Sequence, residues 1–114
     1  MTNWSNEDEK LVTLARSARG RIQALSSAAL RDSTGRTYAS AEVNVETLKF
    51  SAIALVVSQA VASGAEGIEA IVICAPEDFP ITPTDLEYIR GFAGQGIPIH
   101  HISLVGDLLE TLTT

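Results

Sequence analysis

Residues 44–64 read NVETLKFSAIALVVSQAVASG, and within this stretch strand-like sequence gives way to a strongly apolar helix. Between residues 52 and 62 only Ser58 and Gln59 are strongly polar, so the helix lacks a broad polar face. A helix that is apolar on nearly all sides is normally buried. We therefore expect the helix Ser51 to Ser63 to lie at the centre of the domain and to form a contact between subunits.

Length and composition limit the class of protein. The chain has 114 residues, which predicts a single domain over residues 1–114. Its net charge of −6 opposes the neutralisation of phosphates, so duplex nucleic acid is not an expected partner. The apolar helix is shorter than the roughly 20 residues that span a bilayer, and the polar, acidic start does not resemble a signal peptide. We expect a cytoplasmic protein with no membrane partner.

The sequence before residue 44 predicts one helix and two strands. Apolar residues recur at helical spacing over residues 7–19, and Gly20 is expected to end that helix. Small and apolar residues from Ala24 to Arg31 predict a strand. The turn-forming residues 32–35 separate it from a second extended segment, Arg36 to Val45, so the two strands are expected to pair antiparallel.

After the apolar helix, which Gly64 is expected to end, the pattern predicts four more elements. These are a buried strand (Ile68 to Cys74), a helix that begins with a capping box (Thr84 to Glu87), a strand (Ile97 to Leu104) and a short last helix (Asp107 to Leu112). Strands joined through helices run parallel. The whole order predicts an α/β layered domain with a mixed sheet.

Four short motifs follow one another along the chain. They are Ser27-Ala-Ala-Leu30, Thr34-Gly-Arg-Thr-Tyr38, Asn44-Val-Glu46 and Gln59-Ala-Val-Ala-Ser-Gly64. Together they resemble the first two-thirds of a small cytidine deaminase, and the resemblance extends over residues 11–104. It implies a three-layer α/β/α domain with a mixed sheet of about four to five strands.

The resemblance also implies a ribose-binding pair. In the family an Asn-x-Glu motif after the second strand holds the ribose hydroxyls, and Asn44 and Glu46 match it. Residues i and i+2 of an extended backbone point to the same side, so an amide and a carboxylate at this spacing can bind one diol. The alternative is that Asn44 is a turn residue and Glu46 a charge near a helix N-terminus.

The catalytic motifs of the family are replaced in this chain. The family chemistry needs zinc ligands and a proton-transferring Glu at the starts of two helices. Ser51 and Ile53 stand at the positions of the first ligand and the Glu, while Thr84 and Glu87 stand at those of the two cysteines. Hydroxyl groups are poor substitutes for thiolate and imidazole. We therefore expect no zinc or other cofactor and assign no catalytic residue.

Other residues suggest chemistry less strongly. His100 and His101 are adjacent on a strand, so their side chains should point to opposite faces. Cys74 is either a nucleophile or a small apolar filler. The chain also has an acidic group, which we expect to form a solvated edge: Glu66, Glu69, Glu77 and Asp78. It has a basic group, which we expect to lie near a helix C-terminus, where the helix dipole favours cations: Arg16, Arg19 and Arg21.

The leading hypothesis is a zinc-free, catalytically inactive protein of cytidine deaminase-like fold. It would act as an oligomeric interaction module or a small-ligand module, forming dimers or tetramers through the helix Ser51 to Ser63. One alternative is a working nucleoside deaminase with a non-standard metal site built from His100, His101, Cys74 and carboxylates. Another is a nucleoside sensor in which Asn44 and Glu46 bind ribose without catalysis.

Overall fold

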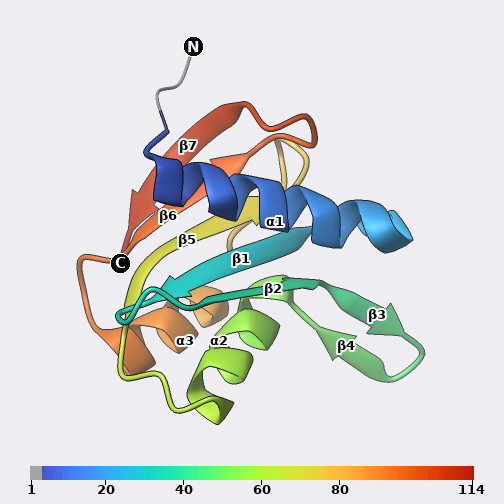
Figure 1. Ribbon diagram of the computed structural model, residues 1–114. Coiled ribbons are helices and arrows are strands. Elements are labelled where there is room, and N and C mark those ends of the chain that lie inside the picture. The colour runs from blue at the N-terminus through green and yellow to red at the C-terminus, as the bar shows by residue number, and fades with distance from the viewer. Residues whose placement is uncertain (1–3) are drawn as a thin grey trace.

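A computed structural model describes residues 4–114, which form three layers (Figure 1). A five-stranded sheet is the middle layer. Helix α1 (Asn6–Ile22) covers one face of the sheet, and helices α2 (Ala52–Ala62) and α3 (Pro83–Ala93) cover the other. The predicted fold class, an α/β domain with a mixed sheet of about four to five strands, is confirmed.

The strand order of the sheet is β2-β1-β5-β6-β7. Strands β5 and β6 are parallel, and the other neighbouring pairs are antiparallel. A separate two-stranded hairpin continues from the end of β2 and projects from the domain (Figure 1). The strands are β1 (Ser27–Asp32), β2 (Thr37–Ala41), β3 (Val43–Val45), β4 (Leu48–Phe50), β5 (Ile68–Cys74), β6 (Pro98–Ile102) and β7 (Leu108–Thr113).

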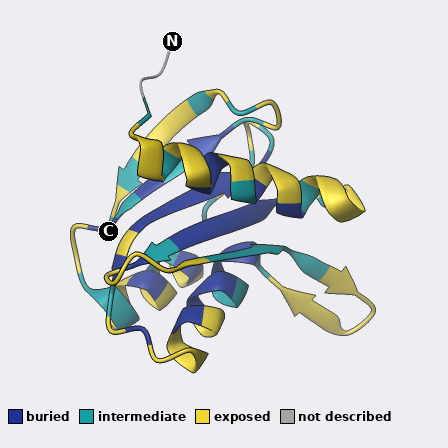
Figure 2. Ribbon diagram, in the orientation of Figure 1, coloured by how far each residue is buried: buried dark blue, intermediate teal, exposed yellow. Residues whose placement is uncertain are grey.

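Strand β5 lies at the middle of the sheet and is buried along most of its length (Figure 2), and the sheet separates two apolar clusters. Ile71 and Ile73 belong to the apolar cluster under α2 and α3, whereas Val72 and Cys74 belong to the cluster under α1. Successive side chains on a strand point to opposite faces, so a strand covered on both sides is apolar along most of its length, and in β5 the exposed Glu69 is the one charged residue. The interpretation of this segment as a buried strand is confirmed.

The turn between β1 and β2 is fixed by a buried carboxylate. The side chain of Asp32 is fully buried and accepts hydrogen bonds from the backbone and hydroxyl of Thr34, from Arg36 and from the hydroxyl of Tyr38. Burial raises the pKa of Asp32, but these hydrogen bonds outweigh it and hold the pKa well below its usual value. Gly35 has a φ of 91°, which suits glycine, so the predicted turn is confirmed.

The prediction of a last helix over Asp107 to Leu112 is wrong. Residues Leu108–Thr113 form β7, which pairs antiparallel with β6. The leucines of this segment fit a helical period, but the open edge of β6 supplies ladder hydrogen bonds that a helix would leave unused. Tertiary pairing therefore overrides the local pattern.

Two predictions about helices also need correction. Helix α1 continues through Gly20 to Ile22 and ends where Gln23 adopts a left-handed conformation (φ 51°). Helix α2 covers one face of the sheet instead of lying at the centre, and its outer side is open, with Val61 51% exposed. Within the described part of the chain, every helix is too short or too polar for a transmembrane segment.

Candidate functional site

The N-terminal ends of α2 and α3 meet through Ser51, one of the four positions matched to the family motif, and Asp85. Ser51 is the N-cap of α2, and its Oγ accepts a hydrogen bond from the backbone N–H of Ala54 at 3.0 Å. The same hydroxyl donates to Oδ1 of Asp85 at 2.7 Å. Asp85 is 7% exposed and lies in the first turn of α3. Two helix N-termini thus face one buried carboxylate, and helix dipoles favour negative charge there.

Asp85 belongs to this site, although the sequence analysis did not assign it. The N-cap of α3 is Thr82, whose hydroxyl accepts the backbone N–H of Asp85 at 3.1 Å. Pro83 follows at the start of the helix, where its lack of an N–H costs nothing. The predicted capping box from Thr84 to Glu87 is therefore wrong, because the cap lies two residues earlier. The sequence signal was a Thr followed by Pro and then by an acid at the third helical position.

The other three positions at which a residue of the family motif is replaced lie apart from Ser51 and Asp85. Ile53 is fully buried in the apolar cluster between α2 and the sheet. Thr84 and Glu87 are exposed on α3. Of the four positions matched to the family motif, the structure brings only Ser51 into contact with Asp85, so the carboxylate at this place comes from a residue between the matched positions.

A small cavity opens beside Ser51. It has a volume of about 340 Å³ and is lined by residues next to β1, from the start of the β3–β4 hairpin, from β4, from the N-cap of α2 and from the loop before α3: Ser26, Glu42, Val43, Asn44, Lys49, Phe50, Ser51 and Phe79. Oε1 of Glu42 accepts a hydrogen bond from the buried hydroxyl of Ser26 at 2.7 Å. The cavity therefore combines a carboxylate, an amide, an ammonium and two aromatic rings.

Asn44 and Glu46 do not share one extended segment. Asn44 lies on β3 and lines the cavity. Glu46 lies in the two-residue turn between β3 and β4, where its φ is 55°, and it is not among the cavity residues. The geometric argument for one diol between the two side chains requires extended backbone at both, and Glu46 does not have it.

The two histidines point to opposite faces, as the sequence predicts. His100 contacts the edge of Trp4, with ring centroids 5.3 Å apart, and its Nδ1 lies 3.0 Å from the hydroxyl of Thr111. His101 is buried on the other face, and its Nε2 lies 3.2 Å from the carbonyl oxygens of Ala75 and Pro76. Both rings have structural partners.

Cys74 lies inside the core below α1. It is fully buried, and burial raises the pKa of its thiol, outweighing the cations of Arg19 and Arg16, which act in the opposite direction. A thiol with a raised pKa is a poor nucleophile at neutral pH. Among the described residues, no three His, Cys, Asp or Glu side chains gather in an arrangement that could hold a metal ion.

The zinc that the family resemblance implies does not suit the side chains present. Ser51 and Asp85 offer one hydroxyl and one carboxylate, and the hydroxyl is already committed to Ala54 and Asp85. Structural and catalytic zinc sites use three or four thiolate, imidazole or carboxylate ligands. The donor set at these helix ends therefore does not fit a zinc ion.

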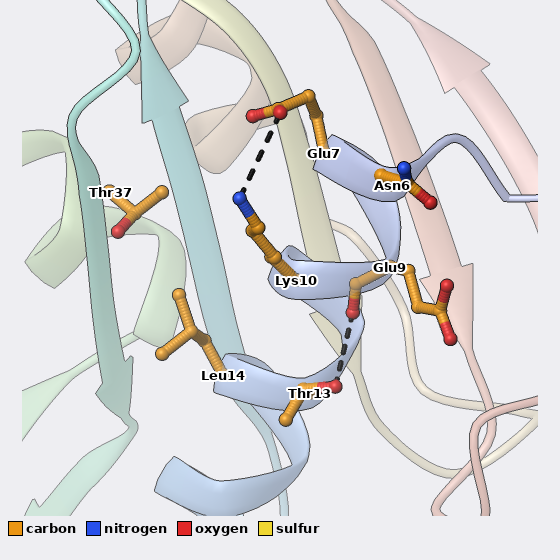
Figure 3. A pocket seen from close by; sticks show the side chains of 7 residues that line it. All are labelled: Asn6, Glu7, Glu9, Lys10, Thr13, Leu14 and Thr37. Carbon is orange, nitrogen blue, oxygen red and sulfur yellow. Dashed lines mark hydrogen bonds and ion pairs between the residues drawn. The ribbon is translucent and has the colours of Figure 1, made fainter.

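Two larger surface grooves differ from this cavity in their lining and lie away from Ser51. A groove of about 670 Å³ between α2 and α3 is mainly apolar, with Phe50, Val57, Val61, Tyr88 and Phe92 among its lining residues. A groove of about 680 Å³ lies between α1 and Thr37 of β2 (Figure 3). In the second groove the only ion pair between side chains drawn in Figure 3 is the exposed one of Lys10 and Glu7, at 3.9 Å.

Of the charged groups noted in the sequence, the acidic residues lie at the surface and two of the three arginines lie at the end of α1. Glu69 accepts a hydrogen bond from Arg31 at 2.7 Å, and Glu66, Glu77 and Asp78 are exposed. Arg19 and Arg21 lie in the last turn of α1, where the helix dipole favours cations.

Comparisons with known proteins agree with this architecture. A family model described as cytidine deaminase-like matches residues 4–106. No curated protein matches the sequence. Among solved structures, cytidine deaminase from Burkholderia pseudomallei has a TM-score of 0.77 at 17% identity, with 99% of this chain and 93% of that chain covered.

Two mycobacterial enzymes are similar to the chain in the same way. Cytidine deaminase from Mycobacterium leprae has a TM-score of 0.70 at 16% identity, covering 96% of this chain and 94% of that one. The enzyme from Mycobacterium tuberculosis has a TM-score of 0.69 at 14% identity, covering 85% and 86%. At such low identity the likeness establishes a shared fold.

Proposed function

The chain belongs to the cytidine deaminase-like family, and we propose that it is a member that does not deaminate and that binds a small polar ligand beside Ser51. The observation that carries this proposal is the hydrogen bond between Ser51 and Asp85. It fills the meeting point of α2 and α3 with a hydroxyl and a carboxylate that bind each other. An activated water would need a metal and a free acid–base group there.

The surroundings of Ser51 support the loss of proton transfer. Ile53 is fully buried in the apolar core, at the position that the family resemblance implies for the acid–base Glu. The aliphatic side chain of isoleucine can neither donate nor accept a proton. Asp85 is held by Ser51 and lies at a different place on the fold, so it does not restore that role.

The cavity beside Ser51 supports ligand binding. Phe50 and Phe79 offer apolar ring faces, while Asn44 and Lys49 offer hydrogen-bond donors at its rim. Pockets that combine apolar walls with a few polar groups are the usual form of small-molecule sites. A volume of about 340 Å³ suits a ligand of the size of a nucleoside or smaller.

Metal analysis together with a turnover assay tests the loss of catalysis. The purified chain, dialysed against zinc and then washed, should contain far less than one zinc per chain and should not convert cytidine to uridine. A bacterial cytidine deaminase treated in parallel is the positive control. One tightly held zinc per chain with measurable turnover contradicts the proposal.

Titration calorimetry with cytidine and uridine tests ligand binding. We expect heat of binding with the unmodified chain and about tenfold weaker binding with Asn44→Ala, since a lost hydrogen bond at a ligand costs about a factor of ten. Glu46→Ala is the matched control, because Glu46 is exposed and does not line the cavity. Absence of heat in the unmodified chain removes both nucleosides as ligands.

A further inference from the structure

Strand β2 is an edge of the sheet, and its own sequence does little to block pairing. Residues Thr37–Ala41 read TYASA, with no charged residue and no proline. Natural edge strands usually carry such residues to prevent pairing with another chain. The opposite edge, β7, does carry a charge, Glu110, near its middle. The two edges of this sheet are therefore not equivalent.

The backbone of β2 presents a regular set of outward groups. The hydrogen bonds at its two ends run from Asp32 N–H to the carbonyl of Arg36 (2.8 Å) and from Glu42 N–H to the carbonyl of Ser26 (3.0 Å). In an antiparallel ladder, alternate residues point their N–H and C=O groups to opposite sides. The backbone N–H and C=O groups of residues 36, 38, 40 and 42 thus point toward β1, and the same groups of Thr37, Ala39 and Ala41 point away from the sheet.

We propose that β2 pairs antiparallel with β2 of a second copy of this chain, in the register centred on Ala39. This register places Ala39 opposite the partner's Ala39 and Thr37 opposite the partner's Ala41, so all the outward groups form ladder hydrogen bonds. It also places Arg36 directly opposite the partner's Glu42 at each end. The two sheets would join into one sheet about a two-fold axis.

The charges at the two ends support this register. Arg36 is half exposed, with a side-chain exposure of 52%. Its Nε bonds Asp32, and its Nη1 lies 3.4 Å from the carbonyl of Ser63, which holds the guanidinium at the strand end. Glu42 uses Oε1 for Ser26. Opposite charges directly across a strand pair stabilise it, and the symmetry supplies two such pairs.

Helix α2 contacts β1 and β2, so two-fold pairing brings α2 of both copies side by side on one face of the joined sheet. The partly exposed Leu55 and the exposed Gln59, one helical turn apart, lie on the side of α2 away from the α3 groove. On the other face, the groove between α1 and Thr37 lies open at the same edge (Figure 3). The subunit contact predicted on the helix Ser51 to Ser63 would then accompany the strand pairing.

Cysteine cross-linking tests the register directly. Residues in a hydrogen-bonded pair have Cα atoms about 5.5 Å apart, within the range that a disulfide spans. Ala39→Cys should therefore give a covalent dimer under mild oxidation. Thr37→Cys and Ala41→Cys should each run as a monomer under denaturing, non-reducing conditions, because each new cysteine lies about 14 Å from the same cysteine of the second copy. A mixture of these two variants should cross-link. The native Cys74 is buried and serves as the internal control.

Sedimentation velocity across a concentration series measures the association itself. Glu42→Lys should raise the dimer dissociation constant about tenfold, because it places two cations opposite each other at both ends. Glu87→Lys makes the same charge change on the exposed surface of α3 and should leave association unchanged. A monomer at millimolar concentration, or a dimer in which Ala39→Cys fails to cross-link, overturns the proposal. Association through the α2 and α3 groove alone would give the second of these results.

Discussion

The hydroxyl of Ser51 donates a 2.7 Å hydrogen bond to the carboxylate of Asp85, and this contact joins the first turns of α2 and α3. The two residues are 34 positions apart in sequence and come from helices on the same face of the sheet. A hydrogen bond to a buried charge is stronger than one between neutral groups. The hydrogen bond therefore holds these two helix ends together without a metal ion.

Ser51→Ala should destabilise the protein by about 2 kcal/mol. The substitution removes the N-cap of α2 and the hydrogen bond to Asp85, which are worth about 1 kcal/mol each or somewhat more. Urea unfolding followed by far-UV circular dichroism measures the loss. Ser58→Ala is the control on the same helix: Ser58 is exposed and donates a hydrogen bond to the carbonyl of Ala54 in the preceding turn, so its removal should cost less than about 0.5 kcal/mol.

A double-mutant cycle separates the cap from the contact between helices. Ser51→Ala, Asp85→Asn and the double variant should give a coupling energy of about 1 kcal/mol, since residues that share a hydrogen bond are not independent. A coupling energy near zero would mean that Ser51 acts as a helix cap alone and that its hydrogen bond to Asp85 does not stabilise the protein.

The layered fold was predictable because its signals are local and repeated. The apolar run from Ile68 to Cys74 gave a buried strand with the correct bounds, and Gly64, with a φ of 84°, ends α2 as predicted. The pair at Ser51 and Asp85 was not predictable in the same way. Alignment to the family motif drew attention to Thr84 and Glu87, while the residue that contacts Ser51 depends on how α3 is rotated about its axis.

The last strand and the β3–β4 hairpin show a second limit. Leu108, Leu109 and Leu112 fit a helical spacing, and only the presence of a neighbouring open strand makes the extended form better. The hairpin has Glu46 at positive φ, a conformation that sequence rules assign to Gly, Asn or Asp. In both places a nonlocal or strained feature decided the structure, so reasoning from local pattern failed.

Asp32→Asn should destabilise the protein by about 3 kcal/mol at pH 7, because it removes a buried charge that Thr34, Arg36 and Tyr38 surround. The folded-state pKa of Asp32 lies below its unfolded value, which is about 3.9. Its contribution is therefore complete above that value and is lost as the pH falls toward the folded pKa. The stability difference between the two proteins should stay constant from about pH 7 to 5 and shrink below about pH 4.

Asp78→Asn is the matched control for this experiment, because Asp78 is exposed and carries the same charge. It should change the free energy of unfolding by less than about 0.5 kcal/mol at every pH in the series. An Asp32→Asn protein as stable as the unmodified chain at pH 7 would mean that the turn does not depend on the carboxylate.

Arg31→Met should lower the free energy of unfolding by about 1 to 2 kcal/mol at low salt and by less at high salt. Arg31 is 11% exposed and bonds Asp8 of α1 at 3.0 Å and Glu69 of β5 at 2.7 Å, so it ties the helix to the sheet. Ion pairs at partly exposed sites are screened by added salt. Unfolding at 0.05 and 1 M sodium chloride measures both effects. Lys10→Met, which removes an exposed pair with Glu7, should have no measurable effect.

The Cys74 thiol should react with a disulfide reagent such as Ellman's reagent only when the protein opens. Cys74 is fully buried, and burial raises the pKa of its thiol, so both access and thiolate fraction are low in the folded state. Native protein at pH 7.5 should therefore label very slowly, while protein in 6 M guanidinium should label at the rate of a free cysteine. Ser51→Ala should speed the native reaction roughly 30-fold, the factor that corresponds to a loss of about 2 kcal/mol, if labelling requires global unfolding. Fast labelling of the unmodified native chain would instead show that the core under α1 opens locally, and would return Cys74 to the set of candidate nucleophiles.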